Sequence, residues 1–200
     1  MNSRVSDGNG GFLNKAITFN VTDQIGETMT LATGGTIKGN LGADHFTGRA
    51  SRDLIYGGVD ADSLVGNAGA GLPSVGKGND TLDGGADGDR LFGGGGVDSL
   101  SGGDGLGRIA SGRGADDLSG GLGKDTFVFN KGDGADRIMD FDGSDMIEFH
   151  GFGTMDAATF LSTYAHTTAT SVVIDRPGSD GITLPGFTDL AGLANNLLIG

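Results

Sequence analysis

The chain of 200 residues contains no cysteine, no tryptophan and only three prolines. The absence of cysteine excludes disulfide bonds and thiolate metal sites. A hydrophobic content of 36% without tryptophan is low for an ordinary thick core, so another force has to help stabilise the fold. No stretch is long and apolar enough to suggest a membrane span, and residues 1–30 lack the basic and apolar regions of a signal peptide. Membrane insertion is therefore not expected.

Basic residues are also scarce, since 13 Lys and Arg stand against 26 Asp and Glu and give a formal net charge of −13. Such a charge disfavours binding to nucleic acid and to anionic membranes. It favours multivalent cations as partners.

Glycine, by contrast, is abundant, with 42 residues, and its periodicity separates an ordered repeat from disorder. Aligned on Asp80 and read in steps of nine, residues 40–129 form ten consecutive blocks without an insertion. The fifth position is Asp in eight blocks, namely Asp44, Asp53, Asp62, Asp80, Asp89, Asp98, Asp116 and Asp125. The seventh is apolar in all ten, namely Phe46, Ile55, Leu64, Pro73, Leu82, Leu91, Leu100, Ile109, Leu118 and Phe127. Residues 31–39 look like a decayed eleventh block.

The spacing within a block predicts a turn followed by a short strand. Glycine accepts a positive φ, so the first six residues can turn tightly, and the next three can run extended with the apolar side chain inward. Two blocks then make one coil of 18 residues, and successive coils stack as parallel strands about 4.8 Å apart. Five coils would be roughly 24 Å long. The sequence therefore predicts an all-β fold, a parallel β-roll.

This geometry divides the aspartates into two rows, one on each edge of the roll. The complete row is Asp44, Asp62, Asp80, Asp98 and Asp116. The other row reads Asp53, Gly71, Asp89, Gly107 and Asp125, so both missing carboxylates lie on the same edge. We expect the complete edge to bind metal better.

Calcium is the cation that this donor set favours. Carboxylates about 4.8 Å apart repel by roughly 3 kcal/mol at an effective dielectric constant near 20, and a divalent ion between them removes that repulsion. Carboxylate and carbonyl oxygens suit Ca²⁺ better than zinc or copper. The alternative is that these aspartates only form turns, but turn formation does not require a period of 18 residues. Metal binding is expected to be coupled to folding.

The blocks resemble the GGxGxDxUx nonapeptide of the RTX, or haemolysin-type, calcium-binding proteins. The resemblance implies a right-handed solenoid in which each ion lies between turns one coil apart, bound by the Asp and by carbonyls two and four residues before it. On the complete edge these residues are Gly58, Asp60 and Asp62; Gly76, Gly78 and Asp80; Gly94, Gly96 and Asp98; and Gly112, Gly114 and Asp116. On the other edge they are Gly85, Asp87 and Asp89, and Gly121, Gly123 and Asp125. Asp44 and Asp53 are also predicted to be metal ligands, although the turn before Asp53 departs from the pattern, with Arg49, Ser51 and Arg52.

The flanks suggest a division into three parts: residues 1–30, 31–129 and 130–200. Residues 17, 19 and 21 alternate as in a half-buried strand, which resembles the last strand of a cadherin-like β-sandwich repeat; an independent N-terminal strand is the alternative. On the first interpretation the chain is a piece of a longer protein. Residues 125–152 resemble the C-terminal region of serralysin-like proteins, and four aspartates there are candidates either for one more calcium site or for surface turns: Asp136, Asp140, Asp142 and Asp145.

Residues 130–200 are expected to cap the roll and to include a possible secretion region, because a solenoid needs a cover for its final coil. Residues 155–165 have a helical pattern with Phe160, Leu161 and Tyr164 on one side. The segments TSVVID and GITLPG predict a hairpin, and FTDLAGLANNLLI predicts a short helix with an apolar tail.

The outer faces of the roll should differ. Beside the apolar slots of the complete edge lie small or polar residues, whereas the other face carries Leu54, Tyr56, Leu72, Phe92 and Val128. We expect the flanking segments to cover this apolar patch; a surface for a partner or ligand is the alternative.

No enzymatic motif is present. HExxH and GxSxG are absent, and His45, His150 and His166 are scattered, so a catalytic domain would lie outside this chain. We interpret the chain as a calcium-dependent structural and secretion module of an extracellular protein, for which the family resemblance implies export by type I secretion machinery. The alternative is an accessory module of a secreted enzyme or adhesin that binds a carbohydrate or a protein partner.

Overall fold

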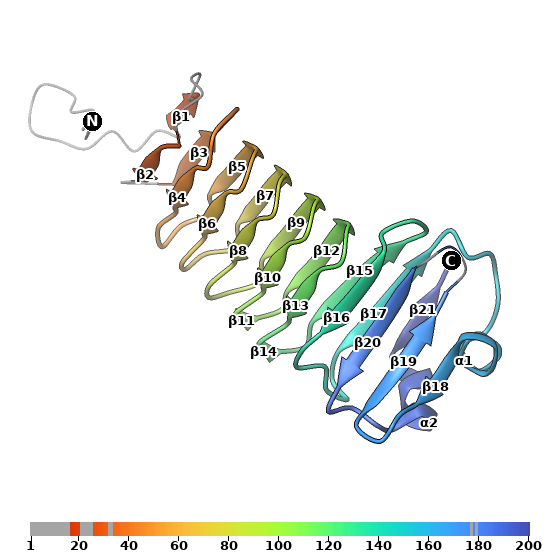
Figure 1. The fold of residues 1–200 in the computed structure, drawn as a ribbon. Helices are drawn as coiled ribbons and strands as arrows, with labels where there is room; N and C mark the ends of the chain where they lie inside the picture. Colours follow the sequence, from red (N-terminus) through yellow and green to blue (C-terminus); the bar gives the residue numbers. More distant parts are fainter. Residues whose placement is uncertain (1–16, 21–25, 32–33, 177, 179) are drawn as a thin grey trace, which may run out of the picture.

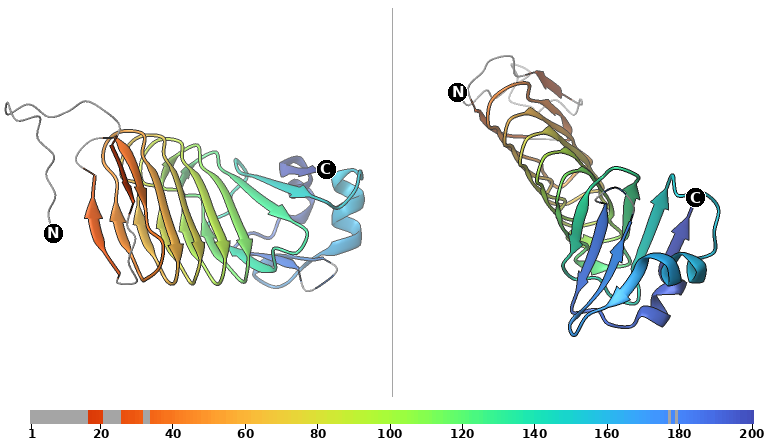
Figure 2. Two further views of the ribbon diagram at one scale, coloured as in Figure 1. Left: turned by 90° about the horizontal axis from the view of Figure 1, so that it is seen from above. Right: turned by 45° about the vertical axis from the view of Figure 1, so that its right-hand side comes forward.

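The computed structural model describes residues 17–20, 26–31, 34–176, 178 and 180–200, and it forms a parallel β-solenoid of about seven turns (Figure 1). Two sheets face each other along the whole solenoid, and two short α-helices lie at its C-terminal end (Figure 2). The prediction of an all-β parallel roll is confirmed.

The two sheets alternate along the chain. Sheet A has nine strands in the spatial order β1 (Ile17–Asn20), β3 (Gly35–Lys38), β5 (Leu54–Val59), β7 (Leu72–Lys77), β9 (Arg90–Gly95), β12 (Arg108–Arg113), β15 (Thr126–Asn130), β17 (Met146–His150) and β21 (Leu197–Ile199). Sheet B has ten strands in the order β18 (Ala165–Thr167), β19 (Ser171–Asp175), β20 (Gly181–Pro185), β16 (Ala135–Ile138), β13 (Asp117–Ser119), β10 (Ser99–Ser101), β8 (Thr81–Asp83), β6 (Ser63–Val65), β4 (His45–Thr47) and β2 (Thr28–Thr30). A small two-stranded sheet joins β11 (Asp104–Gly105) to β14 (Leu122–Gly123).

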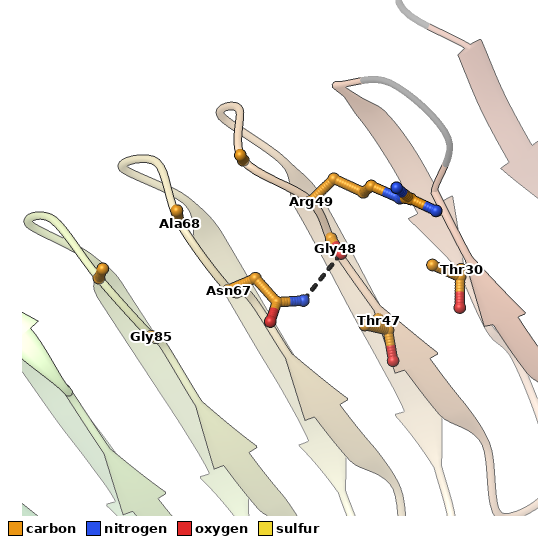
Figure 3. Close-up of a pocket in the computed structure, with 9 residues that line it drawn as sticks. Thr30, Thr47, Gly48, Arg49, Asn67, Ala68 and Gly85 are labelled. Atoms are coloured by element: carbon orange, nitrogen blue, oxygen red, sulfur yellow. Dashed lines mark hydrogen bonds between the residues drawn. The ribbon is translucent and has the colours of Figure 1, made fainter.

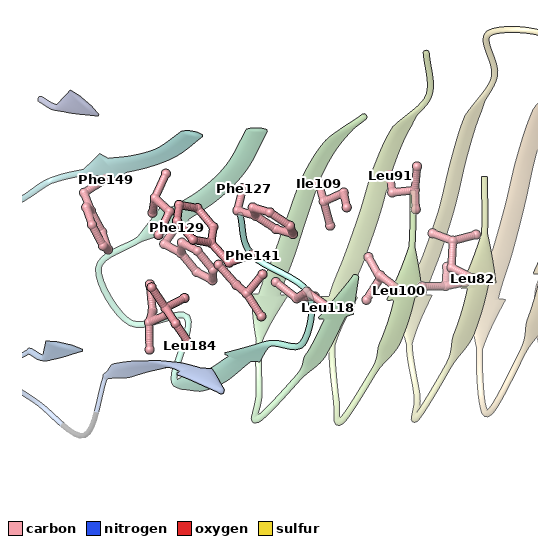
Figure 4. Packing of buried hydrophobic residues seen from close by; sticks show 14 of the residues in the cluster. Leu82, Leu91, Leu100, Ile109, Leu118, Phe127, Phe129, Phe141, Phe149 and Leu184 are labelled. Atoms are coloured by element: carbon pink, nitrogen blue, oxygen red, sulfur yellow. The ribbon is translucent and has the colours of Figure 1, made fainter. Parts of the chain in front are cut away.

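The register within the repeats is the one predicted from the period of 18 residues. Leu64 pairs with Leu82, and Leu82 with Leu100, in parallel strands of sheet B. The apolar slot residues point inward and are buried, whereas their neighbours on both sides are more exposed. Figure 4 shows these side chains as a narrow column between the two sheets, from Leu82 to Phe127.

The sheets run across both predicted domain boundaries, which remain predictions about domain organisation. β1 pairs with β3 and β2 pairs with β4, so residues 17–20 and 28–30 continue the parallel sheets. Residues 1–16 and 21–25, which include most of the predicted N-terminal segment, lie outside the described residues. On the other side, β16 and β17 extend the two sheets beyond residue 130.

The C-terminal cap is built around aromatic rings, unlike the roll. The ring centroids of Phe149 and Phe160 are 4.7 Å apart, and those of Phe141 and Phe187 are 5.1 Å apart in an edge-to-face contact. Helix α1 (Ala157–Tyr164) begins after Asp156, whose side chain accepts a hydrogen bond from the Thr159 N–H, and it buries Phe160 and Leu161 as predicted. The cap therefore has a thicker core than the coils before it.

The rest of the cap also follows the sequence expectations. β19 and β20 form an antiparallel hairpin, and helix α2 (Leu190–Leu193) is followed by the 3-10 turn η1 (Ala194–Asn196). The apolar tail forms β21, which pairs in parallel with β17. Among the residues that the structure describes, no helix has the length and apolar character to cross a membrane.

The outer face of sheet A is not covered in the way the sequence suggested. Tyr56 and Phe92 point outward and are 37% and 47% exposed, and Val128 is buried. Helices α1 and α2 pack on strands of the cap and on η1. The expectation that the C-terminal flank covers this face is wrong for the described residues, because that flank lengthens the roll.

Candidate metal centres

The aspartates of the repeats lie in two columns, one along each edge of the roll. The first edge is the column Asp44, Asp62, Asp80, Asp98, Asp116 and, beyond the repeats, Asp136. The second edge is the column Asp53, Gly71, Asp89, Gly107, Asp125 and then Asp145. All of these aspartates are buried, with at most 3% of the residue exposed. The two-row arrangement predicted from the sequence is confirmed.

Each carboxylate connects its own coil to the coil before it. The Asp62 N–H donates to Oδ1 of Asp80 over 2.7 Å, and the Asp80 N–H donates to Oδ1 of Asp98 over 2.9 Å. The same bond occurs on the second edge, where the Gly71 N–H donates to Oδ1 of Asp89 over 2.6 Å. One oxygen of each carboxylate therefore has a structural role that is independent of any metal.

The two edges differ in the second carboxylate oxygen, Oδ2. In eight aspartates Oδ2 is buried and has no hydrogen-bond partner: Asp44, Asp62, Asp80, Asp98, Asp116 and Asp136 on the first edge, and Asp89 and Asp125 on the second. A buried carboxylate oxygen without a partner is costly in free energy. A cation would both bind the free oxygens and offset the negative charge of the column. These residues fit a metal ion on the chemistry of their free oxygens.

The raised pKa values of these carboxylates also show that their ionised form is costly in this fold. Burial raises the pKa of Asp62 to about 7, and the like charges of Asp80 and Asp44 add to the effect. Burial likewise raises the pKa of Asp98 to about 6 and that of Asp89 to about 6. Burial is also the main cause of a raised pKa at five further members of the two columns: Asp80, Asp116, Asp125, Asp136 and Asp145. Protons or a divalent cation would relieve this cost.

The turns before these aspartates bring the main chains of successive coils close together. Every residue predicted to supply a carbonyl has a positive φ, including the two aspartates Asp60 (φ 80°) and Asp87 (φ 76°). A Cβ on Gly96 would collide with the carbonyl oxygen of Gly78, one coil earlier. Glycine is therefore required at this position both for its φ and because carbonyls of successive coils stack closely.

A second glycine position was missed in the sequence analysis. A Cβ on Gly93 would collide with Oδ2 of Asp98 and with the carbonyl oxygen of Ser111, one coil on. The same holds at Gly57 for Oδ2 of Asp62. The free carboxylate oxygen thus lies next to a small space that only glycine leaves open. The signal in the sequence is the glycine that ends most of the nine-residue blocks.

The donors available on each edge are therefore hard oxygens. Among the described residues, no three His, Asp or Glu side chains converge on one point. A metal ion on either edge would have to combine one or two carboxylates from adjacent coils with main-chain carbonyl oxygens, a donor set that suits Ca²⁺.

Asp53 differs from the other aspartates at the fifth position of the repeats. Its Oδ1 accepts the Gly35 N–H over 3.0 Å and its Oδ2 accepts the Arg49 N–H over 2.7 Å. Nε of Arg49 in turn donates to the carbonyl oxygen of Leu31 over 2.9 Å. Figure 3 shows Arg49 reaching across the first coils above a pocket that Asn67 also lines. This turn offers no unpartnered carboxylate oxygen, although the sequence analysis included Asp53 among the metal ligands.

The four aspartates considered for one more calcium site or for surface turns do not all lie together. Asp140, Asp142 and Asp145 are neighbours of Asp125 on the second edge, whereas Asp136 lies on the first, so a single site made of all four is not formed. The Oδ1 of Asp136 accepts the Asp116 N–H, and the Oδ1 of Asp145 accepts the Asp125 N–H, so these two continue different edges. Asp140 accepts the N–H groups of Gly120 and Gly121. The coils lengthen here from 18 to 20 residues, which hides the columns from a strict period of nine. The local pattern Asp-x-apolar is nevertheless retained at both positions.

The first edge ends at a cation that belongs to the chain. In the coil after Asp136, the position of the aspartate is taken by Ile182. Arg176 is 4% exposed there, and its guanidinium lies 5.2 to 5.7 Å from three phenylalanine ring centroids and 3.4 Å from the carbonyl oxygen of Gly134. Asp180 and Asp136 are the main acidic neighbours of this arginine. A fixed positive charge thus stands at the end of the carboxylate column.

The fold and the two edges define a class: a parallel β-roll whose turns present carboxylate and carbonyl oxygens. A family model of four copies of the RTX calcium-binding nonapeptide repeat matches residues 38–72, 74–109 and 101–134. The central part of the chain consists of RTX calcium-binding nonapeptide repeats, as the sequence pattern indicated. The family model ends at residue 134, so the likeness of the cap to serralysin-type C-terminal regions remains a prediction.

Two solved structures are similar over most of this chain. One is the extracellular lipase LipA from Serratia marcescens, with 16% identity and a TM-score of 0.43 over 84% of this chain; the chain spans 45% of the length of that lipase. The other is the AlgE6R3 subunit of the mannuronan C5-epimerase from Azotobacter vinelandii, with 22% identity and a TM-score of 0.33 over 89% of this chain and 81% of that one. A search of curated proteins gave no match.

Proposed function

We propose that this chain is a calcium-dependent folding module of an extracellular protein, in which Ca²⁺ occupies the first edge and, more sparsely, the second. The observation that carries this proposal is the set of eight buried carboxylates, each with one oxygen bonded to the adjacent coil and one oxygen without a partner. In this role the chain catalyses no reaction.

The coupling of calcium to folding follows from the electrostatics of the columns. Without a cation, stacking one coil on the next brings carboxylates to about 4.8 Å, where they repel by roughly 3 kcal/mol at an effective dielectric constant near 20. The narrow column of one apolar residue per block adds little burial for each coil. A calcium ion between coils reverses the sign of the electrostatic contribution, so metal binding and stacking are one reaction.

The same coupling supports a role in secretion. Calcium is scarce inside cells and millimolar outside, and extracellular calcium modules bind at about 0.1 to 1 mM. The chain would stay unfolded until it leaves the cell, which suits export by type I secretion machinery. The repeat family supports this proposal, because RTX repeat proteins are typically secreted. The aromatic cap gives the growing stack a closed end on which the last coils can form.

The test is a calcium titration of the full chain, first stripped of metal with EGTA and then followed by circular dichroism. We expect a largely unstructured chain in EGTA and a β-sheet spectrum that returns at roughly 0.1 to 1 mM Ca²⁺. Magnesium at the same concentration is the control, and it should restore little, because it demands a regular octahedral shell and dehydrates reluctantly. A β-sheet spectrum that chelation does not change would refute the proposal.

A further inference from the structure

The two outer faces of the roll carry opposite charge. The strands of sheet A contain five basic residues, Lys38, Lys77, Arg90, Arg108 and Arg113, and a single acidic one, Glu148. The exposed residues of the sheet B strands include one basic residue, Arg137, and three acidic ones, Asp83, Asp117 and Asp175, because Asp136 is buried in the first edge. In a chain of net charge −13, one face is thus distinctly basic. We call the outer surface of sheet A the basic face.

Most of these basic groups are not neutralised by the protein. Arg108 forms an ion pair with Glu148 over 2.7 Å, and this pair lowers the pKa of Glu148. Among the described residues, no ion pair involves the other four basic residues of the sheet A strands. The ammonium of Lys38 lies 5.4 Å from the ring centroid of Tyr56, which leaves its charge uncompensated. The basic face therefore has positive charge to offer to a ligand.

The basic face also has a groove with an apolar floor. Phe92, Ala110 and Val128 are neighbours on adjacent strands and, with Asn130 and His150, line a hollow of about 640 Å³. Two glycines, Gly94 and Gly112, form the adjoining part of the floor. Arg90 precedes the floor of its strand by two residues, and Arg113 follows Gly112 directly. Basic side chains thus stand on both sides of the groove.

Two exposed aromatic rings extend this surface along the roll axis. Tyr56 and Phe92 occupy the same position in strands two coils apart, separated by Ser74. Two coils correspond to about 10 Å. A ligand that meets both rings must be long and must repeat along the direction in which the coils stack.

We propose that the basic face binds a linear acidic polysaccharide. The apolar faces of its sugar rings would pack on Phe92 and Tyr56, and its carboxylates would meet Lys77, Arg90 and Arg113. This inference rests on the proposed function, because the face exists only when the coils are stacked. A polysaccharide with a carboxylate on alternate sugars has a modest charge density. Nucleic acid, with one charge for about every 1.7 Å of duplex, would be repelled more strongly by the acidic edges and by the net charge of −13.

The experiment is calorimetric titration of the calcium-loaded full chain with a hyaluronan decasaccharide, which carries a carboxylate on every second sugar. Its methyl ester, which has the same backbone without charge, is the ligand control. The test variants are Arg90→Gln with Arg113→Gln, and Phe92→Ser, which copies the residue found at Ser74. The matched control is Arg137→Gln with Lys124→Gln, which changes the net charge equally at two exposed residues outside sheet A.

We expect the decasaccharide to bind the wild type, and the ester to bind at least about fivefold more weakly. The double arginine variant should weaken binding about five- to tenfold, in line with the loss of two exposed charge contacts, and the control less than about twofold. Circular dichroism against calcium is measured on every variant and should be unchanged. Added salt should weaken binding to the wild type and have less effect on the double arginine variant.

The outcomes distinguish the two proposals. If calcium no longer induces folding, the proposed function fails. If calcium-induced folding is intact but the decasaccharide does not bind, or binds the control and test variants with equal loss, only the polysaccharide inference is overturned. Tighter binding of a single-stranded oligonucleotide or of vesicles with anionic headgroups, or concentration-dependent self-association that the arginine substitutions abolish, would assign the basic face to another partner and would also overturn it.

Discussion

The two edges of the roll have the same backbone geometry but different chemistry. On both, a carboxylate Oδ1 accepts an N–H from the preceding coil, as in Asp98 on the first edge and Asp89 on the second. On the first edge all six aspartates retain a buried, unpartnered Oδ2, whereas on the second only Asp89 and Asp125 do. The comparison teaches that one aspartate has two separable roles. One oxygen sets the stacking of coils, and the other is available to a metal.

The ends of the edges show which groups of the chain lie beside the carboxylates there. At the start of the second edge, main-chain N–H groups satisfy both oxygens of Asp53, and the Arg49 side chain binds the neighbouring coil. At the end of the first edge, Arg176 places its guanidinium beside Gly134, near Asp136 and Asp180. Where the repeat breaks down, the chain supplies its own donors and its own positive charge.

The largest effect is expected at Arg176. Replacement Arg176→Met keeps an apolar side chain against the phenylalanine rings but leaves Asp136 and Asp180 without their cation. Burial already lowers the pKa of the guanidinium, which offsets part of this loss, so the calcium-loaded chain should lose about 2 kcal/mol of unfolding free energy in urea. Arg176→Lys, which keeps the charge, should lose less. Unchanged stability in Arg176→Met would mean that the first edge needs no fixed charge at its end.

The second prediction compares the two edges directly. Asp98→Asn keeps a carbonyl oxygen for the Asp80 N–H but removes the charge shared with the coil on each side, so the calcium midpoint should rise about tenfold, in line with a loss of about 1.4 kcal/mol. Asp53→Asn, at a carboxylate whose oxygens are both hydrogen-bonded, should shift it less than about twofold. Circular dichroism against calcium measures both. Equal shifts would remove the distinction between the edges.

The third prediction concerns pH and has opposite signs with and without calcium. The raised pKa of Asp62, about 7 against an ordinary 3.8, means that the metal-free fold binds protons more tightly than the unfolded chain. That contribution to stability is present below about pH 4 and is lost as pH rises through about 7. Protons and calcium compete for the same oxygens, so the calcium midpoint should fall several-fold between about pH 5.5 and 8. Spectra of metal-free and calcium-loaded chain across this range test both signs. A calcium midpoint independent of pH would contradict it.

The smallest effect is a gain on the second edge. A Cβ on Gly71 would lie 3.2 Å from Oδ1 of Asp89 and 3.4 Å from the carbonyl oxygen of Asp53, so a small adjustment admits a side chain. Gly71→Asp restores the missing carboxylate and should lower the calcium midpoint about twofold. Gly71→Ala adds the same Cβ without charge and is the control. If both variants behave alike, the gap in the column does not limit metal binding.

The sequence by itself determined the coil, the two columns and the oxygen chemistry of the turns. Each coil contacts only its neighbours, so a local pattern repeated every nine residues specifies the strand register, the inward position of Leu82 and Leu100, and the column that contains Asp80 and Asp98. The turn glycines followed from the same logic, because positive φ is a property of the local chain.

Only the tertiary structure decided the features that lie outside the nine-residue repeats. The lengthened coils carry Asp136 and Asp145 into the two columns although the period of nine has stopped. Arg176 reaches the end of the first edge from a hairpin forty residues away from Asp136 in sequence. Exposure of Phe92 beside the groove also depends on which groups other coils and the cap bring near. Repetition determines contacts between adjacent coils, but long-range packing determines how a column begins and ends and what remains open to a partner.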